Sequence, residues 1–408
     1  MRRRTIFSIF IIFYLYFLLG GLLSYRLANY FWFINYDFNY QVSFLMPILY
    51  ALAALAAFLL AYFTFEKIKF KSGLTNNETT KPVGSSEDRY IPALLALFGV
   101  GAAGFLLMMS QYGGKIPLLS EHADDFRTRI SSGLPQILYF QLVLTAVLGY
   151  FRAGRSRERK QRYLMAGITV ISLCLILMGG SRSMFLTPVL VILIDVWRKK
   201  VIKTGYLVMA GTAAVIIWFA VGILRMGVEL GPEIFLLRFA ADFAPEFREF
   251  AKLLAYIPDK IGYLNGQMFT NTFYIMIPGG VLDLVGVAKS VDWVPFGEFL
   301  KNLFGYEFAG GGLRAGLIAE FYANFGPWGI IGGFYFLGII IRFFDSRINR
   351  FSGDKSALYL LIGISLASST LFTLDAVIYK IAAFIFGWII YKAVLFAISE
   401  ISLTIPQN

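Results

Sequence analysis

Long apolar runs separated by short polar segments occupy most of the chain. A helix needs about 20 mostly apolar residues to cross a bilayer, and ten runs reach or approach that length. The predicted spans cover residues 5–24, 42–65, 91–110, 134–151, 163–180, 184–197, 204–224, 327–344, 357–374 and 376–398. This pattern predicts an all-α, polytopic integral membrane protein with about 10 transmembrane helices. The number becomes 10–12 if apolar stretches of the longest connection also enter the bilayer.

One connection is much longer than the others and divides the chain into three parts. Residues 1–224 form a predicted seven-span bundle, 225–326 a large extracytoplasmic loop with interfacial helices, and 327–408 a three-span C-terminal part. Connections of such length are usually functional when they are ordered. The loop is therefore where we expect much of the chemistry.

Charge supports the membrane assignment and sets the orientation. Only 15% of the 408 residues are charged, against about 25% in ordinary soluble domains, which excludes a typical soluble enzyme. With the N-terminus inside, the inner segments hold 23 of the 37 Lys and Arg residues, as the positive-inside rule requires. Both termini are then cytoplasmic. The net charge of +12 reflects topology and gives no reason to expect a nucleic-acid partner.

The chain has little that could bind a metal or a nucleotide. It contains one Cys (Cys174) and one His (His122), which excludes a disulfide framework and the usual metal sites. No phosphate-binding glycine motif is present. We therefore predict no metal site and no cofactor. No small-residue cleavage site follows the first span, so it is expected to be a retained anchor. Glu121, His122 and Asp124 form either a solvated loop or a weak acid–base set.

Arg182 follows the two glycines of a tight outer turn between the fifth and sixth predicted spans. An arginine at the membrane edge is costly unless it is paired, which makes it a functional candidate. The alternative is an arginine whose head extends to the lipid phosphates. A second candidate is the run that contains Gly311 and Gly312 and ends at Arg314. Backbone N–H groups at a helix start, with a neighbouring arginine, suit an anion; the alternative is a flexible hinge.

Two aromatic stretches have both a structural and a functional interpretation. Phenylalanines recur at helical spacing over 235–250, beside acidic residues that include Asp242 and Glu246. This pattern is typical of an amphipathic helix on the outer leaflet, and it also fits a substrate groove in which Asp242 or Glu246 acts as a base. Residues 30–40 are mostly aromatic and form either an interface belt or a surface that stacks on sugars.

Two stretches resemble the Wzy-type O-antigen and exopolysaccharide polymerases of bacteria, also called oligosaccharide repeat-unit polymerases. One is Gly180-Ser181-Arg182-Ser183. The other starts at Gly312-Leu313-Arg314, continues through Ala319-Glu320-Phe321-Tyr322-Ala323-Asn324-Phe325-Gly326 and ends at Pro327-Trp328-Gly329. The layout of many spans with one large outer loop late in the chain is similar too.

This resemblance implies a membrane glycosyltransferase architecture of the GT-C-like class and a place in the bacterial cytoplasmic membrane. It implies that a glycan on polyprenyl diphosphate is transferred, without metal, to a new lipid-linked repeat unit at the outer face. The donor and acceptor glycolipids and membrane lipid are the implied partners, with a chain-length regulator as a further candidate. The implied catalytic residues are Arg182, Arg314 and Glu320, with substrate contacts from Arg225, Gly311, Gly312, Tyr322, Asp242 and Glu246.

Other functions remain open at this point. An O-antigen ligase resembles this architecture but uses a His in the large outer loop, and residues 225–326 contain none. Another membrane transferase is a related alternative. A lipid-linked oligosaccharide flippase belongs to a different class, and it should line a central cavity with charged residues.

The predicted orientation can be tested with two cysteines placed at residues 155 and 252 in a Cys174→Ser background. We expect an impermeant thiol reagent to label position 252 but not position 155 in intact spheroplasts, because only position 252 lies in the predicted outer loop. Labelling of position 155 would reverse the assignment.

Overall fold

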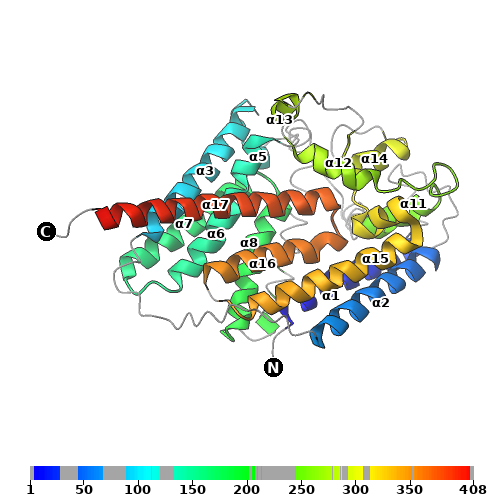
Figure 1. Ribbon diagram of the computed structural model, residues 1–408, viewed down its shortest axis with the longest axis horizontal. Coiled ribbons are helices and arrows are strands. Elements are labelled where there is room, and N and C mark those ends of the chain that lie inside the picture. Colours follow the sequence, from blue (N-terminus) through cyan, green and yellow to red (C-terminus); the bar gives the residue numbers. More distant parts are fainter. Residues whose placement is uncertain are drawn as a thin grey trace. The chain divides into compact units, whose positions relative to one another are not determined.

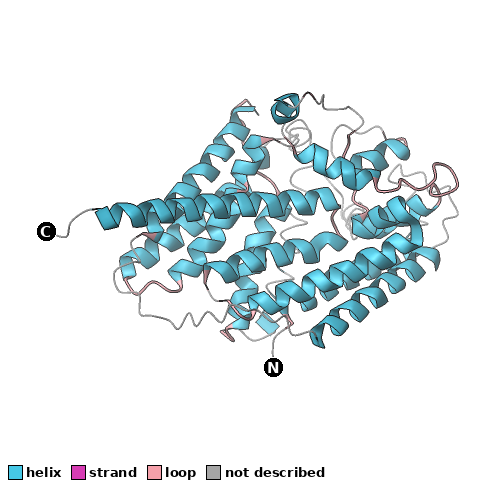
Figure 2. Cartoon of the chain, viewed as in Figure 1, coloured by secondary structure: helices cyan, strands magenta, loops and turns pink. Residues whose placement is uncertain are grey.

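The computed structural model describes residues 4–27, 45–67, 89–111, 113–119, 133–201, 205–206, 209, 213, 245–277, 279–284, 286, 293–306, 313–351 and 353–404. Every regular element in these ranges is a helix, as expected (Figures 1 and 2). The chain forms two compact units. Unit 1 comprises Met1–Lys67, Val228–Ser346 and Gly363–Tyr379; unit 2 comprises Ile68–Gly227, Arg347–Ile362 and Lys380–Asn408.

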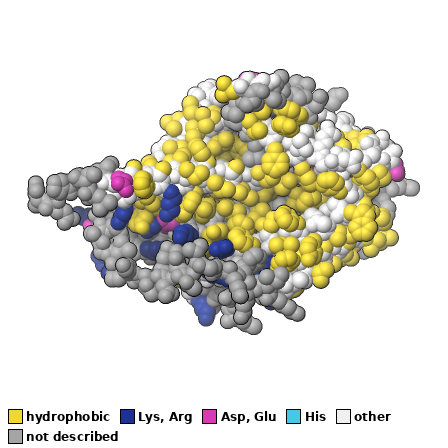
Figure 3. All heavy atoms as spheres, in the orientation of Figure 1, with side chains coloured by type: hydrophobic (Ala, Val, Ile, Leu, Met, Phe, Trp, Pro, Cys, Tyr) yellow, Lys and Arg dark blue, Asp and Glu magenta, His cyan; other side chains and the backbone are white. Residues whose placement is uncertain are grey.

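Six of the described helical segments are long and apolar enough to cross a membrane. They are α2 (Leu45–Lys67), α3 (Tyr90–Gln111), the consecutive α5 (Leu134–Tyr139) and α6 (Gln141–Ala153), α7 (Arg159–Met178), α15 (Gly316–Ile348) and α17 (Leu374–Thr404). Large apolar side chains on them remain exposed, and Figure 3 shows hydrophobic side chains over much of the visible face. Such surfaces are suited to lipid contact.

Three further helices coincide with predicted spans but are not among these six. They are α1 (Thr5–Leu27), α8 (Arg182–Arg198) and α16 (Asp354–Ala367). The predicted span 204–224 lies almost wholly outside the described residues. A polytopic membrane protein is thus confirmed by its helices, whereas a total of ten spans stays a prediction.

The predicted span 357–374 is wrong over its last third. The helix ends at Ala367, a single turn of 3-10 helix, η3 (Ser368–Thr370), follows, and α17 begins at Leu374. The cause is the polar sequence of the segment. Ser368 donates its hydroxyl hydrogen bond to the Ser365 carbonyl oxygen at 2.8 Å, and such side-chain bonds compete with helical backbone bonds.

Aromatic side chains hold α1, α2 and α15 together in unit 1. The rings of Phe10 and Phe58 stack with their centroids 3.8 Å apart, and Phe334 meets both Phe10 and Tyr14 edge-on. At the start of α1, both carboxylate oxygens of Asp345 accept backbone N–H groups, from Ile6 and Phe7. These N–H groups have no partner inside their own helix, so Asp345 fixes where α1 begins.

Four shorter helices of unit 1 come from the predicted outer loop: α11 (Pro245–Leu254), α12 (Gln267–Met276), α13 (Gly279–Leu284) and α14 (Phe296–Leu303). The first of them corrects an expectation, because α11 does not lie on the leaflet with its polar side in water. It packs against α1 and α2 (Figure 1). Nearly all of its residues are buried, its charged ones Glu246, Arg248 and Glu249 included.

Phe247 and Phe250 anchor α11, and one glycine makes the close approach possible. The Phe247 ring lies 5.3 Å from that of Phe17 on α1, and the Phe250 ring 6.4 Å from that of Tyr50 on α2, between centroids. A Cβ atom added at Gly21 would lie 2.5 Å from the Phe247 ring. Only glycine therefore lets the ring seat against α1.

In unit 2, α6 packs against α3, α7 and α8. Buried polar contacts cluster at one end of these helices. The Arg152 guanidinium pairs with Asp354, which also accepts a hydrogen bond from the Tyr391 hydroxyl at 2.9 Å. Arg152 and Asp354 come from segments that are predicted on the inner side, and Tyr391 from the last predicted span.

For the labelling experiment, the outer reporter position 252 is less suitable than Asp259, because Lys252 is half-buried and Asp259 is exposed.

The packing of α11 against α1 can be tested with two glycine variants. Gly21→Ala should lower the free energy of unfolding by about 1–3 kcal/mol, because the added methyl group overpacks the Phe247 ring. Gly99→Ala on α3 is the matched control, since a Cβ there meets nothing within 4 Å, and it should be neutral or slightly stabilising. Thermal unfolding of the purified protein in detergent is the measurement. Equal melting temperatures for both variants would contradict the packing of α11 on α1.

Candidate functional site

The start of α15 carries the most exposed arginine of the candidate site. Arg314 lies in the extended segment just before Gly316, and this segment is tied to α14 because the Leu313 N–H donates to the Gly297 carbonyl oxygen at 2.9 Å. The Arg314 side chain remains 38% exposed. An arginine held at its backbone and open at its guanidinium is suited to bind an anion.

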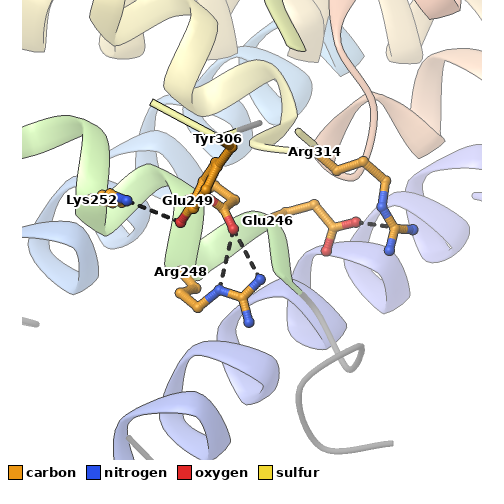
Figure 4. A network of polar contacts seen from close by, with 6 residues as sticks. All are labelled: Glu246, Arg248, Glu249, Lys252, Tyr306 and Arg314. Carbon is orange, nitrogen blue, oxygen red and sulfur yellow. Dashed lines mark hydrogen bonds and ion pairs between the residues drawn. The ribbon is translucent and has the colours of Figure 1, made fainter. Parts of the chain in front are cut away.

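Arg314 faces a buried acid from α11. Its Nη1 atom lies 3.7 Å from Oε1 of Glu246, whose side chain is 3% exposed, and Figure 4 shows the two side chains pointing toward each other. This distance is that of a loose ion pair and is too long for a hydrogen bond. The second carboxylate oxygen, Oε2, is buried without a hydrogen-bond partner among the described residues.

Burial raises the pKa of Glu246 above its ordinary value, although the positive charges of Arg314 and Arg248 act in the opposite direction. A carboxyl group in this position loses water on folding and regains only part of that stabilisation from its partners. Glu246 therefore holds Arg314 weakly, and the arginine keeps free donor capacity.

The rest of the network ties α11 into unit 1. The Arg248 guanidinium donates from Nε and Nη2 to Oε1 of Glu249, at 3.2 and 2.9 Å. Lys252 donates to the Tyr306 hydroxyl at 2.9 Å (Figure 4). Its ammonium group also lies over the rings of Phe304 and Tyr306. The sequence pattern showed acidic residues beside the phenylalanines, and only the burial of α11 shows that these acids need basic partners.

The two other described candidates from α15 are buried. Glu320 has no exposed surface, and its Oε2 atom accepts the Leu374 N–H at 2.7 Å. Tyr322 is 5% exposed and packs its ring among those of Tyr50, Phe250 and Tyr263. Both therefore act inside the protein in this arrangement.

The loop that precedes α12 is pinned to α15, which sequence reasoning missed. Backbone N–H groups of Leu264 and Asn265 donate to the carbonyl oxygens of Ala323 and Asn324. Gly326 then breaks α15 with φ of 65°, and a Cβ there would come within 2.8 Å of the Tyr263 ring. The break before Pro327 agrees with the predicted start of a new helical segment at 327.

Several candidates cannot be placed. Arg225, Asp242, Gly311 and Gly312 lie outside the described residues, as do Glu121, His122 and Asp124. Arg182 is the first residue of α8, after Gly180 with φ of 70°, but its side chain is not among those described. Arg182 belongs to unit 2 and Arg314 to unit 1. Among the described members of the predicted set, the structure pairs Arg314 with Glu246.

Comparison with known proteins gives one match. A family model described as "Putative O-antigen polymerase" matches residues 3–245. The matched region includes Arg182, Arg225 and Asp242, and it ends just before Glu246. No curated protein and no solved structure matches the chain.

The buried carboxyl group of Glu246 predicts a pH dependence. Because its folded pKa lies above its ordinary value of 4.5, the folded protein binds the proton more tightly, and this stabilisation is lost as pH rises from about 4.5 toward the folded pKa. Glu246→Gln cannot lose that proton, so its melting temperature relative to wild type should rise between pH 5 and pH 8. Asp259→Asn, at an exposed position, is the control and should show no such trend. A relative melting temperature of Glu246→Gln that falls with pH would mean that the ion pair outweighs burial.

Proposed function

The chain belongs to the O-antigen polymerase family, and from this membership we propose that it polymerises lipid-linked oligosaccharide repeat units at the outer face of the bacterial cytoplasmic membrane. The match over residues 3–245 is the observation that carries the proposal. The product is O-antigen or a related exopolysaccharide. The apolar helices agree with a multi-pass protein of the inner membrane, and we propose cytoplasmic termini from the distribution of basic residues.

The proposed reaction is glycosyl transfer. The bond between the anomeric carbon of the donor glycan and its phosphate oxygen breaks, and polyprenyl diphosphate leaves. A hydroxyl group at the non-reducing end of the acceptor repeat unit forms the new glycosidic bond and loses its proton. Negative charge grows on the diphosphate as the first bond breaks. A fixed positive charge aimed at that position lowers the barrier.

Arginine supplies this charge in the proposed site. A guanidinium group binds phosphate through two parallel donors, and it needs no metal ion. Arg314 is suited to this role because its backbone is fixed to α14 and its head is partly exposed. Glu246 limits the motion of the arginine from its buried side. We propose Arg182 as a second diphosphate ligand, with Arg225, Asp242, Gly311 and Gly312 as further substrate contacts.

Glu320 and Tyr322 have a different part in this proposal. Both are covered by protein, and one Glu320 oxygen already accepts a backbone N–H. Contact with an acceptor sugar would require the start of α17 to move away. We therefore propose that these residues position the start of α15, and that neither meets the substrate directly.

A deletion strain distinguishes this function from its alternatives. Loss of long glycan chains with single repeat units retained on the lipid acceptor is the outcome expected for a polymerase. Loss of all repeat units from the acceptor would indicate a ligase. Repeat units trapped on the inner leaflet would indicate a flippase.

Arginine variants test the site. Arg314→Ala and Arg182→Ala should each lower the polymerisation rate roughly a hundredfold, the usual effect of removing one donor to a developing anion. Arg314→Lys should recover little, because an ammonium group cannot reproduce the bidentate fork. Rates are measured on purified protein with lipid-linked repeat units in excess EDTA, and chain-length ladders are compared at equal membrane protein levels.

The matched control is Arg159→Ala, an exposed arginine on the predicted inner side, which should keep the wild-type ladder. A normal ladder from Arg314→Ala at normal expression would remove Arg314 from the site. A strict need for Mg²⁺ or Mn²⁺ would contradict the metal-free mechanism.

A further inference from the structure

The connection between α16 and α17, residues 368–373, brings the beginnings of α15 and α17 together in unit 1. After Thr370, residues 371–373 leave the helical path, and α17 starts at Leu374. Gly316, the first residue of α15, has φ of 68°, and a Cβ atom there would overlap the Thr370 carbonyl oxygen. The backbones of α15 and of this segment are therefore in direct contact.

Two carboxyl groups meet at this contact. Glu320 comes from α15 and Asp375 from the first turn of α17, and Asp375 is the charged neighbour of Glu320. Glu320 Oε2 accepts the Leu374 N–H. The other oxygen of Glu320, Oε1, and one oxygen of Asp375, Oδ1, are buried without any hydrogen-bond donor among the described residues.

This pair differs from the other buried carboxyl groups in having no basic partner in the described part of the chain. The contacts of Asp375 are with the Thr373 side chain and with the backbone N–H groups of Asp375 and Ala376. Each of the other buried carboxyl groups in the described ranges has a positive neighbour: Asp195 with Lys199, Glu246 with Arg314, Glu249 with Arg248, Asp345 with Arg342, and Asp354 with Arg152.

Two neighbouring carboxylates disfavour each other's ionisation in such a place. Their charges repel strongly where water is excluded, and the N–H groups at the start of α17 compensate them only in part. Two more oxygen atoms of the same segment lack partners: the hydroxyl oxygens of Ser369 and Thr370, residues that are 1% and 2% exposed. The segment thus combines excess negative charge with buried oxygen atoms that have no donor.

We propose that Glu320 and Asp375 bind one monovalent cation, a proton or Na⁺, at the start of α15 and α17. Two carboxyl groups sharing a single positive charge is the usual solution when like charges are forced together. In interrupted membrane helices, cations are coordinated by the unwound backbone and by C-terminal helix ends, and η3 ends at Thr370 beside this pair. The described residues contain no cluster of three or more acidic, His or Cys side chains that could hold a metal ion, which disfavours a divalent ion.

The bound cation would set the position of Arg314. Gly316 follows Arg314 by two residues and touches Thr370, so the docking of α17 against α15 fixes the backbone that carries the arginine. With the cation bound, one of the two negative charges is cancelled, the repulsion between the carboxyl groups is removed and the contact is stable. Without it, repulsion between the pair favours separation. The cation site stands independently of the proposed glycosyl transfer, and the experiment that tests it uses no glycan.

Infrared difference spectroscopy on the purified full-length protein tests the site. If a proton is bound, the spectrum of wild type minus Glu320→Gln at pH 7 should contain a carboxylic-acid C=O band in both NaCl and choline chloride. If Na⁺ is bound, that band should appear only in choline chloride, because Na⁺ replaces the proton. Either result supports the site.

The control is Asp259→Asn, which should remove only an ionised carboxylate band because Asp259 is exposed. A difference spectrum for Glu320→Gln with ionised carboxylate bands alone, in both salts, would overturn the proposal and indicate a fixed counter-charge. If Glu320→Gln does not accumulate, the double variant Glu320→Gln/Asp375→Asn replaces it, because that variant carries no charge in the segment. Polymerisation failing while the band is present would contradict only the proposed reaction.

Discussion

The pairing of buried charge is the constraint on which the described parts of this protein depend. Unit 1 buries α11 between apolar helices, and with it Glu246, Arg248 and Glu249. Ions in such surroundings cost several kcal/mol each unless a partner of opposite sign is close. Arg248 therefore folds back onto Glu249, and Glu246 draws the segment before α15 toward α11. The position of Arg314 follows from the burial of α11, which in turn depends on Gly21 leaving room for Phe247.

The same constraint explains why Arg314 is only loosely paired. In the proposed site Arg314 would exchange Glu246 for a phosphate, and a fully buried, doubly hydrogen-bonded ion pair would hold it too tightly for that. The observed pair has one half-exposed member and a 3.7 Å separation, so the arginine is positioned at little cost to its remaining donors. Because the family model ends at residue 245, this part of the site rests on the physical chemistry of α11 and α15. The family match instead supports the reaction class.

The helices could be predicted from the sequence because apolar length alone specifies a membrane-spanning helix. The break at Gly326 could also be predicted from the sequence, because a glycine before a proline interrupts a helix. Two features could not be predicted in this way. The charged and aromatic ridges of α11 look the same whether that helix lies on a leaflet or inside a bundle, and only its contacts with α1 and α2 decide between them. The segment 368–373 lies in an apolar run long enough for a span, and its interruption depends on serine hydroxyls and on contact with Gly316.

Glu320 shows how the surroundings of a candidate residue change the role proposed for it. The sequence marks it as an acid in a stretch that resembles known polymerases, and a base is the obvious role for an acid beside a sugar. Its surroundings argue otherwise: no exposed surface, a backbone N–H on one oxygen, and Asp375 as its charged neighbour. An acid that is surrounded by another acid and by apolar side chains lacks the charge balance that ion pairs give the remaining buried carboxyl groups. The small cation that we propose would cancel one of the two negative charges without a further side chain.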